Sequence, residues 1–436
     1  MASSLVLDRT QSALAVPTVH RLANGLTIIA QQMAFEAVNL NLWLRVGSVV
    51  EPDSINGMAH FLEHMIFKGT PELACGEFER LIEARGALTN AATSQDYTHF
   101  YLTTAPQDFA ALAPLQLQLV LNPRLTDDDF ERERPVILEE IRRAYDNPHR
   151  RTFYHAMELA FDRLPYRRPV LGPVQVVETL TAQQMREFHR RWYQSEQMTA
   201  VVVGHLPVEQ LIDTVVQGFE AAQSCRQSWS PHADTESRLN LTREHPFTTI
   251  QRRHHCDRTL QQAQLVMSWR VPGMADLMET HALDVLASVL GRGRLARLVR
   301  DLREERGWVS SVSASNLTYG QQGAFTLFAQ LPVEHLERVE AIIVDHIRHL
   351  QNQPITIDEL ARVCTQVSNG YVFGSETPSD RAGLYGYYHT LTGTIDHALD
   401  YPARIQALSP AEIQAAAQQY LDPDAYGLVV MQPEAG

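Results

Sequence analysis

The sequence has few cysteines and no long apolar run. Four cysteines occur in 436 residues, and no two of them form a CxxC pair: Cys75, Cys225, Cys256 and Cys364. Their scatter argues against a disulfide framework and against a cysteine-rich metal site, so we expect reduced thiols that serve in packing. No window approaches the roughly 18 uninterrupted apolar residues of a membrane-spanning helix, which predicts a protein without membrane contact.

Positive charge is also scarce. Lys and Arg total 37 against 51 Asp and Glu, which gives a net charge of −14. A basic face large enough for nucleic acid is hard to build against this excess, so we expect no nucleic-acid partner. The N-terminal residues lack a basic segment followed by a long apolar stretch, which predicts a cytoplasmic protein.

The chain contains an internal repeat. The segment that begins at Leu180 reads as a capped helix, a short loop and a buried strand, and the segment that begins at Leu408 reads the same way without a gap. Each opens with a capping box, Thr181 with Gln184 and Ser409 with Glu412. The repeat predicts two similar domains, 1–222 and 246–436, joined by a polar linker at 223–245.

Strand and helix patterns alternate in the first half. Asn24-Gly25 separates two strand-like runs and predicts a hairpin. Apolar and polar residues alternate over 38–46, as in a strand with one buried face, and Asp96 to Thr104 is a further strand. We expect helices at 76–85, 107–121 and 126–146. This mixture predicts an α+β fold of two homologous sandwich domains, each a mainly antiparallel sheet packed against helices.

His60-Phe-Leu-Glu-His64 is the most informative motif. Two histidines four residues apart project from one face of a helix and can bind one cation. Glu63 can lie beside that cation without binding it, where a general base for an activated water belongs. The alternative is a core helix with two hydrogen-bonded histidines and a surface glutamate.

A catalytic zinc ion usually has three protein ligands, so a third should come from another rigid element. The acidic helix predicted over 126–146 is the best source. Glu133 and Glu140 lie seven residues apart, on one face, and Glu140 follows an apolar run that suggests burial. Glu139 points elsewhere and is expected to be solvated. The alternative is a charged surface helix with Glu–Arg pairs.

These motifs together resemble the inverted zinc metallopeptidases of the pitrilysin and insulinase type, most closely the two-domain branch of the mitochondrial processing peptidases. The similarity includes Leu22 to Leu26, Gly57 to Thr70, Arg85 to Thr98 and Glu131 to Ile141, and it extends more faintly over the second half. It implies one zinc ion per chain, bound by His60, His64 and Glu140.

The resemblance also implies roles for other residues. Glu133 matches the acidic residue that supports the metal site, and Glu63 matches the general base. The strand with Asn90 and Ala91 matches the edge on which a substrate peptide lies, which suits the unpaired backbone groups of an edge strand. Asn90 as an ordinary turn residue is the alternative.

The second half departs from the family pattern. There an arginine is followed seven residues later by a tyrosine, and the pair helps to bind substrate and to stabilise the oxyanion. Here Arg303 is present but Ser310 occupies the tyrosine position, and Tyr319 lies further on without a supported register. Arg303 in a surface salt bridge is the alternative. The nearest counterpart of the zinc motif, around His281, has lost the pattern.

The sequence therefore predicts a zinc-dependent endopeptidase that cleaves short or unfolded polypeptides inside an enclosed dimeric chamber. The alternatives are a non-catalytic assembly subunit of a processing-peptidase-like complex and a metal hydrolase with a non-peptide substrate. Because Ser310 replaces the tyrosine, we expect a heterodimer with a related chain that lacks HxxEH and keeps the arginine–tyrosine pair, with a homodimer as the alternative.

Overall fold

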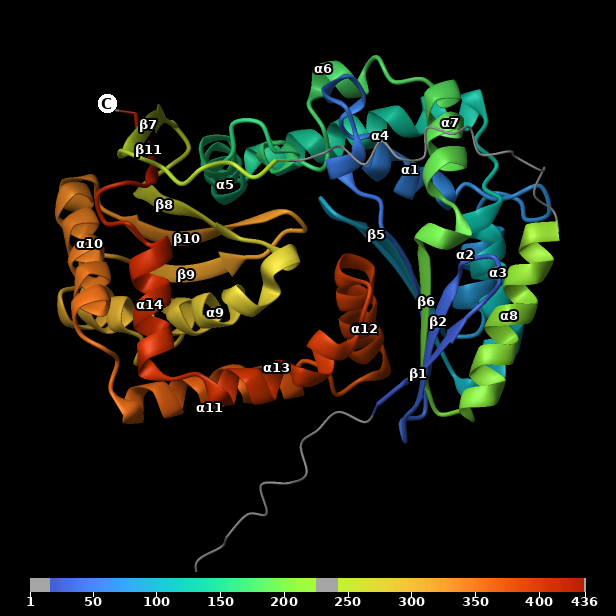
Figure 1. The fold of residues 1–436 in the computed structure, drawn as a ribbon. Helices are drawn as coiled ribbons and strands as arrows, with labels where there is room; N and C mark the ends of the chain where they lie inside the picture. The colour runs from blue at the N-terminus through green and yellow to red at the C-terminus, as the bar shows by residue number, and fades with distance from the viewer. Residues whose placement is uncertain (1–15, 225–241, 435–436) are drawn as a thin grey trace, which may run out of the picture.

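A computed structural model describes residues 16–224 and 242–434 of the chain. Two sheets, each with helices on both sides, account for most of it (Figure 1). This architecture confirms the expected α+β fold. Within the described residues, no helix combines the length and the apolar character needed to cross a membrane.

The first sheet has the strand order β1-β2-β6-β3-β5-β4, and only the β2–β6 pair is parallel. Its strands are β1 (Thr18–Arg21), β2 (Thr27–Gln32), β3 (Val38–Leu44), β4 (Leu88–Thr93), β5 (Thr98–Thr104) and β6 (Met198–Gly204). The predicted hairpin is confirmed, because β1 and β2 pair antiparallel around Asn24-Gly25. β4 lies at one edge of the sheet.

The second sheet has the order β7-β11-β8-β10-β9, and only the β7–β11 pair is parallel. Its strands are β7 (Gln251–Cys256), β8 (Ala263–Pro272), β9 (Ser311–Leu317), β10 (Gln322–Leu331) and β11 (Gly427–Gln432). The order matches that of the first sheet without β1. β9 therefore occupies the edge position that β4 has in the first half.

Helices of the first half are α1 (Met58–Ile66), α2 (Glu77–Glu83), α3 (Phe109–Leu121), α4 (Asp127–Asp146), α5 (Pro148–Ala160), α6 (Val174–Val177), α7 (Ala182–Trp192) and α8 (Val208–Ser224). Those of the second half are α9 (Leu277–Gly291), α10 (Leu336–Asn352), α11 (Ile357–Phe373), α12 (Pro378–Thr392), α13 (Asp396–Ala407) and α14 (Pro410–Tyr420). Both predicted capping boxes are present, at the starts of α7 and α14.

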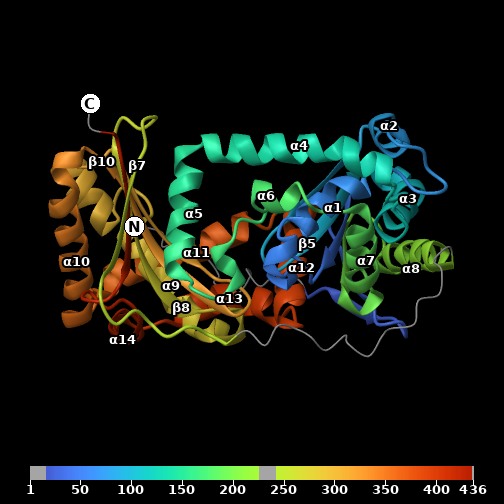
Figure 2. The same cartoon turned by 90° about the horizontal axis from the view of Figure 1, so that it is seen from above.

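Each half supplies a helix to the sheet of the other half. α5 packs against β8 and β11, and α12 packs against β3 and β6. α4 runs from the first half towards the second, where α5 turns along the second sheet (Figure 2). α12 approaches β3 closely, since a Cβ atom on Gly386 would lie 2.0 Å from Nε1 of Trp43. The two halves are therefore interlocked.

This exchange corrects one prediction. All seven residues of β3 are buried, so the strand has two buried faces and not one. Val38, Leu40, Leu42 and Leu44 face the large core of the first half, while Trp43 packs in a second cluster with residues of α12. The alternation in the sequence reflects two different environments, because α12 covers the face that was expected to be exposed.

Two further predictions concern the cysteines and the linker. Cys75, Cys256 and Cys364 are free thiols, but only Cys364 is buried, so the expected packing role is wrong for the other two. Cys225 lies outside the described residues. So does most of the predicted linker at 223–245, although Ser224 still belongs to α8. The domain boundaries 1–222 and 246–436 stay predictions.

Candidate metal centre and active site

The helix that carries the motif, α1, begins at a fixed point because a buried carboxylate binds its first N–H groups. Glu51 accepts hydrogen bonds from the backbone N–H of Gly57 at 3.0 Å and of Ala59 at 2.7 Å. Negative charge at a helix N-terminus is favourable. Gly57 has φ 101°, and a Cβ atom there would meet a backbone oxygen at 2.7 Å, so the turn into α1 requires glycine.

The second element of the site is α4. Its N-terminus is capped by Thr126, whose hydroxyl accepts a hydrogen bond from the N–H of Asp129 at 3.1 Å. The ring of Phe130 on α4 stacks on that of Phe61 on α1, with centroids 4.3 Å apart and planes inclined by 18°. Phe61 directly follows His60. This aromatic contact therefore fixes α4 at a short distance from the two histidines.

His60, His64 and Glu140 converge between these helices. One ligand atom from each lies within 4.8 Å of the other two. Oε2 of Glu140 is 3.5 Å from Nε2 of His60 and 3.4 Å from Nε2 of His64. Two imidazole nitrogens and one carboxylate oxygen form a donor set that suits zinc and leaves a fourth position open. The Glu140 side chain is 41% exposed, so the expected burial at this position is wrong.

The two histidines differ in protonation. Burial, together with the nearby charge of His64, lowers the pKa of His60 to about 4, so its ring is neutral at pH 7. Burial opposes charge on His64 as well, but hydrogen bonds to Glu133 and Glu140 raise its pKa to about 9. A cation at this position must displace a proton from His64, so its affinity falls as the pH decreases.

Glu133 orients His64. Its Oε1 lies 3.0 Å from Nδ1 of His64, and its Oε2 lies 2.6 Å from Nζ of Lys68. Burial favours the neutral acid, but the hydrogen bonds from His64 and Lys68 outweigh it and lower the pKa of Glu133. An ionised Glu133 accepts a hydrogen bond from the N–H at Nδ1 of His64, and Nε2 is then directed at Glu140. Such a partner fixes the tautomer of a metal-binding histidine.

Glu63 lies beside this cluster and is held by the edge strand. The hydroxyl of Thr93, the last residue of β4, donates a hydrogen bond of 2.5 Å to Oε2 of Glu63. Burial raises the pKa of Glu63, and the Thr93 hydrogen bond partly offsets the increase. A carboxylate whose pKa is raised is better suited to accept a proton and hold it until it is passed on.

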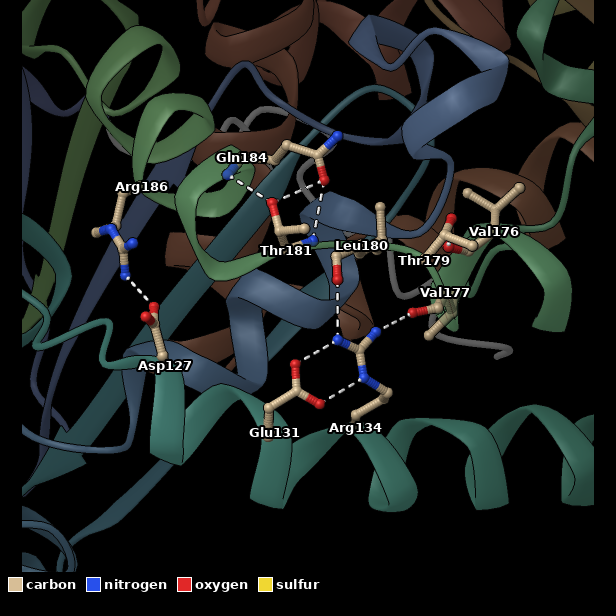
Figure 3. Close-up of polar contacts among 10 residues, drawn as sticks. All are labelled: Asp127, Glu131, Arg134, Val176, Val177, Thr179, Leu180, Thr181, Gln184 and Arg186. Carbon is tan, nitrogen blue, oxygen red and sulfur yellow. Dashed lines mark hydrogen bonds and ion pairs between the residues drawn. The ribbon is translucent and has the colours of Figure 1, made fainter.

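A second set of contacts fixes α4 from outside, around Arg134 (Figure 3). The Arg134 guanidinium donates hydrogen bonds to the carbonyl oxygens of Val177 at 2.5 Å and Leu180 at 2.8 Å, and both oxygens of Glu131 accept from it. It also lies over the ring of Phe130, 4.9 Å from the centroid. Arg134 thus joins α4 to the last residue of α6 and to the segment that leads into α7.

The expected peptide edge is exposed. β4 has one paired side, towards β5, and its other side is free within the sheet. Asn90 is exposed on this strand, while Ala91 packs partly against the core. Asn90 therefore lies in a strand and not in a turn. Its role in substrate binding stays a prediction.

The residues expected from the second half have other partners in the described structure. Arg303, in the short π-helical segment η8 (Val299–Glu305), pairs with Glu304 at 2.6 Å, and no described polar contact joins it to the metal ligands. Ser310 donates a hydrogen bond to the carbonyl oxygen of Gln330 at 3.1 Å. Tyr319 stacks on Tyr166, with ring centroids 4.6 Å apart. No hydroxyl donor from these positions reaches His60 and His64 in the described structure.

Three residues that hold the candidate site in place were not predicted from the sequence: Lys68, Thr93 and Arg134. Lys68 lies four residues after His64, so helical spacing gave a signal that it faces the same side. Thr93 and Arg134 act through partners that are distant in the chain, and no local pattern identifies such contacts.

Known proteins are similar to this chain in sequence and fold. The profile of the family described as "Insulinase (Peptidase family M16)" matches residues 27–174, and that described as "Peptidase M16 inactive domain" matches residues 179–367. Together they cover most of the chain. The zinc-binding motif lies within the first match. The second match agrees with the absence of an HxxEH motif from the second half.

Similar proteins include an uncharacterized zinc protease of Mycobacterium tuberculosis, 29% identical over 427 residues, which cover 97% of this chain and 94% of that protein. The zinc protease PqqE of Helicobacter pylori is 24% identical over 416 residues, with coverages of 94% and 92%. The crystal structure of a protease from Helicobacter pylori superposes with a TM-score of 0.87 at 23% identity, over 96% of this chain and 99% of that one. The chain belongs to peptidase family M16, the insulinase or pitrilysin family.

Proposed function

We propose that this protein is a zinc-dependent endopeptidase that binds one zinc ion per chain through His60, His64 and Glu140. The observation that carries the proposal is the convergence of one ligand atom from each of these three side chains within 4.8 Å. The carboxylate of Glu63 lies on α1, the helix that also carries the two histidines. Zinc bound there supplies a Lewis acid that polarises the scissile carbonyl and makes a water molecule acidic.

Glu63 moves the proton in the proposed reaction. Its Oε2 is held by Thr93, so its Oε1 is the oxygen available to take a proton from the attacking water. The peptide bond then breaks, and the same oxygen returns the proton to the leaving amine. Burial keeps the pKa of Glu63 raised, which favours this return.

The substrate in this proposal is a short or unfolded polypeptide that lies along β4. Asn90 and Ala91 belong to that strand, and backbone groups on its free side can align an extended chain of almost any sequence. The N–H of Ala91 donates a hydrogen bond to Oδ1 of Asn90 at 2.9 Å and would exchange it for one to the peptide. A folded protein has most of its strands already paired and protects the edges that remain, so it offers few segments that can lie along β4. We further propose, from the resemblance to processing peptidases, that a second chain facing this one encloses the site.

The competing proposal is a non-catalytic assembly subunit. The description of the match to residues 179–367 as an inactive domain favours it for that part of the chain. The first half retains both histidines, Glu140 and Glu63, and a purely structural subunit does not need this general base. This difference favours the peptidase.

The test is the variant Glu63→Gln, with Glu139→Gln as the control for loss of a carboxylate near the site. Glu63→Gln should bind zinc as the unchanged chain does, but should no longer cleave an unstructured peptide. Glu139 is half-exposed and pairs with arginines of its own helix, so its variant should keep both properties. Full cleavage by Glu63→Gln, or full zinc content in a His60→Ala, His64→Ala double variant, would overturn the proposal.

A further inference from the structure

The second half contains a cavity of about 560 Å³, a size that suits a small organic ligand or a long side chain. It lies between α9, the edge strand β9 and the helices α11, α12 and α13. A carboxylate and four aromatic rings dominate its lining: Asp284, Tyr371, Tyr387, Tyr388 and Tyr401. None of these residues belongs to the zinc site.

Asp284 is a carboxylate without a positive partner. Its Oδ1 accepts a hydrogen bond from Asn316 on β9, and its Oδ2 accepts one from the hydroxyl of Tyr401, each at 2.8 Å. Among the described residues no Lys, Arg or His forms an ion pair with it. Burial raises its pKa to about 6. A carboxylate in such surroundings is costly to ionise, and a cation beside it removes much of that cost.

Aromatic side chains line the cavity together with this carboxylate. The ring of Tyr401 stacks on that of Tyr371, with centroids 4.5 Å apart and an angle of 22°. The hydroxyl of Tyr387 donates to the carbonyl oxygen of Thr318 at 3.3 Å, which fixes that ring at another side of the cavity. Aromatic faces attract organic cations, and guanidinium and alkylammonium groups are the usual guests. Arg292, the one cationic side chain in the lining, lies on the exposed C-terminal end of α9.

The internal repeat relates this cavity to the zinc site. Along the chain, α9 follows β8 and precedes β9, just as α1 follows β3 and precedes β4. His281-Ala-Leu-Asp284 on α9 resembles His60-Phe-Leu-Glu63 on α1. Asp284 accepts a hydrogen bond from a side chain of the edge strand, as Glu63 does. Val285 follows where the second histidine would stand, so the second half keeps the carboxylate without a metal-binding pair.

We propose that this cavity is a binding site for an organic cation, a guanidinium or alkylammonium group, held by the Asp284 carboxylate and the faces of the surrounding tyrosines. The site is separate from the metal centre, and it does not depend on peptidase activity. The cation can come from an arginine or lysine side chain of a polypeptide or from a free small molecule.

Calorimetric titration of the full zinc-loaded chain tests the proposal. Nα-acetyl-arginine amide represents the side chain of a polypeptide, and methylguanidinium represents the free cation. Nα-acetyl-citrulline amide has nearly the same shape as the first probe and no charge. We expect saturable binding of the arginine probe and at least tenfold weaker binding of the citrulline probe. Binding of methylguanidinium at similar strength would identify the free cation as a source, and weaker binding would identify the polypeptide.

Asp284→Asn keeps the shape of the side chain and removes its charge, so it should weaken binding of the arginine probe at least tenfold. Glu279→Gln is the matched control, because Glu279 lies exposed on the same helix and outside the cavity lining. It should bind like the unchanged chain, and thermal unfolding of both variants checks that they fold. The proposal is wrong if the citrulline probe binds equally well, or if folded Asp284→Asn retains full affinity. Loss of cleavage by Glu63→Gln bears only on the peptidase proposal.

Discussion

The hydroxyl of Thr93 donates a hydrogen bond of 2.5 Å to Oε2 of Glu63, and so joins the end of the edge strand to the helix that carries both histidines. In the proposed function, a peptide on β4 would lie next to Thr93, the residue that orients the proposed general base. The proposal therefore assigns substrate binding and proton transfer to one structural element.

Removal of this hydroxyl should shift the pH profile of cleavage. The hydrogen bond lowers the pKa of Glu63, so Thr93→Val should raise that pKa. Glu63 must be ionised to accept a proton, so the acid limb of kcat/KM should move to higher pH. Thr93→Ser keeps the hydroxyl and should retain the original profile. If the acid limbs of Thr93→Val and of the unchanged chain superimpose, Thr93 does not control the pKa of Glu63.

Glu133→Gln should weaken zinc binding. The amide oxygen can still accept a hydrogen bond from Nδ1 of His64, but it lacks the charge that stabilises this proton, so the ring is held less firmly. Changes to such supporting partners typically cost about 10–100-fold in metal affinity. Competition with a chromogenic chelator measures the loss. Glu139→Gln, on the same helix, should leave the affinity unchanged, and equal affinities for the two variants would refute the role of Glu133.

Arg134→Ala should reduce the stability of the chain. It leaves the carbonyl oxygens of Val177 and Leu180 without their donor, and it removes the cation from the face of Phe130. An unsatisfied group of this kind costs about 1–3 kcal/mol in the free energy of unfolding. Denaturant unfolding measures the change. Arg132→Ala, with a side chain 75% exposed, is the control and should be nearly neutral.

The sequence predicted the main elements of this site because they depend on local spacing. The histidines share a helix face through a separation of four residues, and the repeated capping boxes fix two equivalent helices. Membership of the insulinase or pitrilysin family, the resemblance that pointed to Glu140, is confirmed. Membership of the processing-peptidase branch stays a proposal.

Long-range contacts were not predictable in this way. The second buried face of β3 depends on α12, which belongs to the other half of the chain. Alternation of apolar and polar residues does not show whether the second face of a strand is exposed to solvent or covered by a helix that is distant in the sequence. The Asp284 cavity likewise needs side chains from α9, β9, α11, α12 and α13.

Asp284 should give the chain a pH-dependent stability. Its pKa is about 6 in the folded chain, against an ordinary value of 3.8. Between about pH 4 and 6 the folded chain keeps this proton while the unfolded chain has released it. The free energy of unfolding therefore falls as the pH rises through this window, by up to about 3 kcal/mol, and Asp284 adds no slope above it.

Denaturant unfolding between pH 4 and 7 measures this effect. Zinc-free protein is used, so that release of zinc at low pH does not contribute to the change in stability. The difference in unfolding free energy between the unchanged chain and Asp284→Asn should decrease across the window, because the variant lacks the titrating group. Glu279→Gln should follow the unchanged chain. Parallel curves for the unchanged chain and Asp284→Asn would show that Asp284 titrates normally.

The last prediction concerns the partner. Ser310 stands where the family resemblance leads us to expect a tyrosine. Its hydroxyl forms hydrogen bonds within the second half of the chain, to Gln262 and Gln330. Loss of one oxyanion donor typically costs about 10²–10³ in rate. We therefore expect the isolated chain to be a slow peptidase, and an equimolar related chain with the arginine–tyrosine pair to raise kcat by about that factor. The same chain with its tyrosine changed to phenylalanine should still associate, as sedimentation would measure, but should give little acceleration. A homodimer that cleaves at full rate, and that the related chain leaves unaffected, would show that the site is complete without this tyrosine.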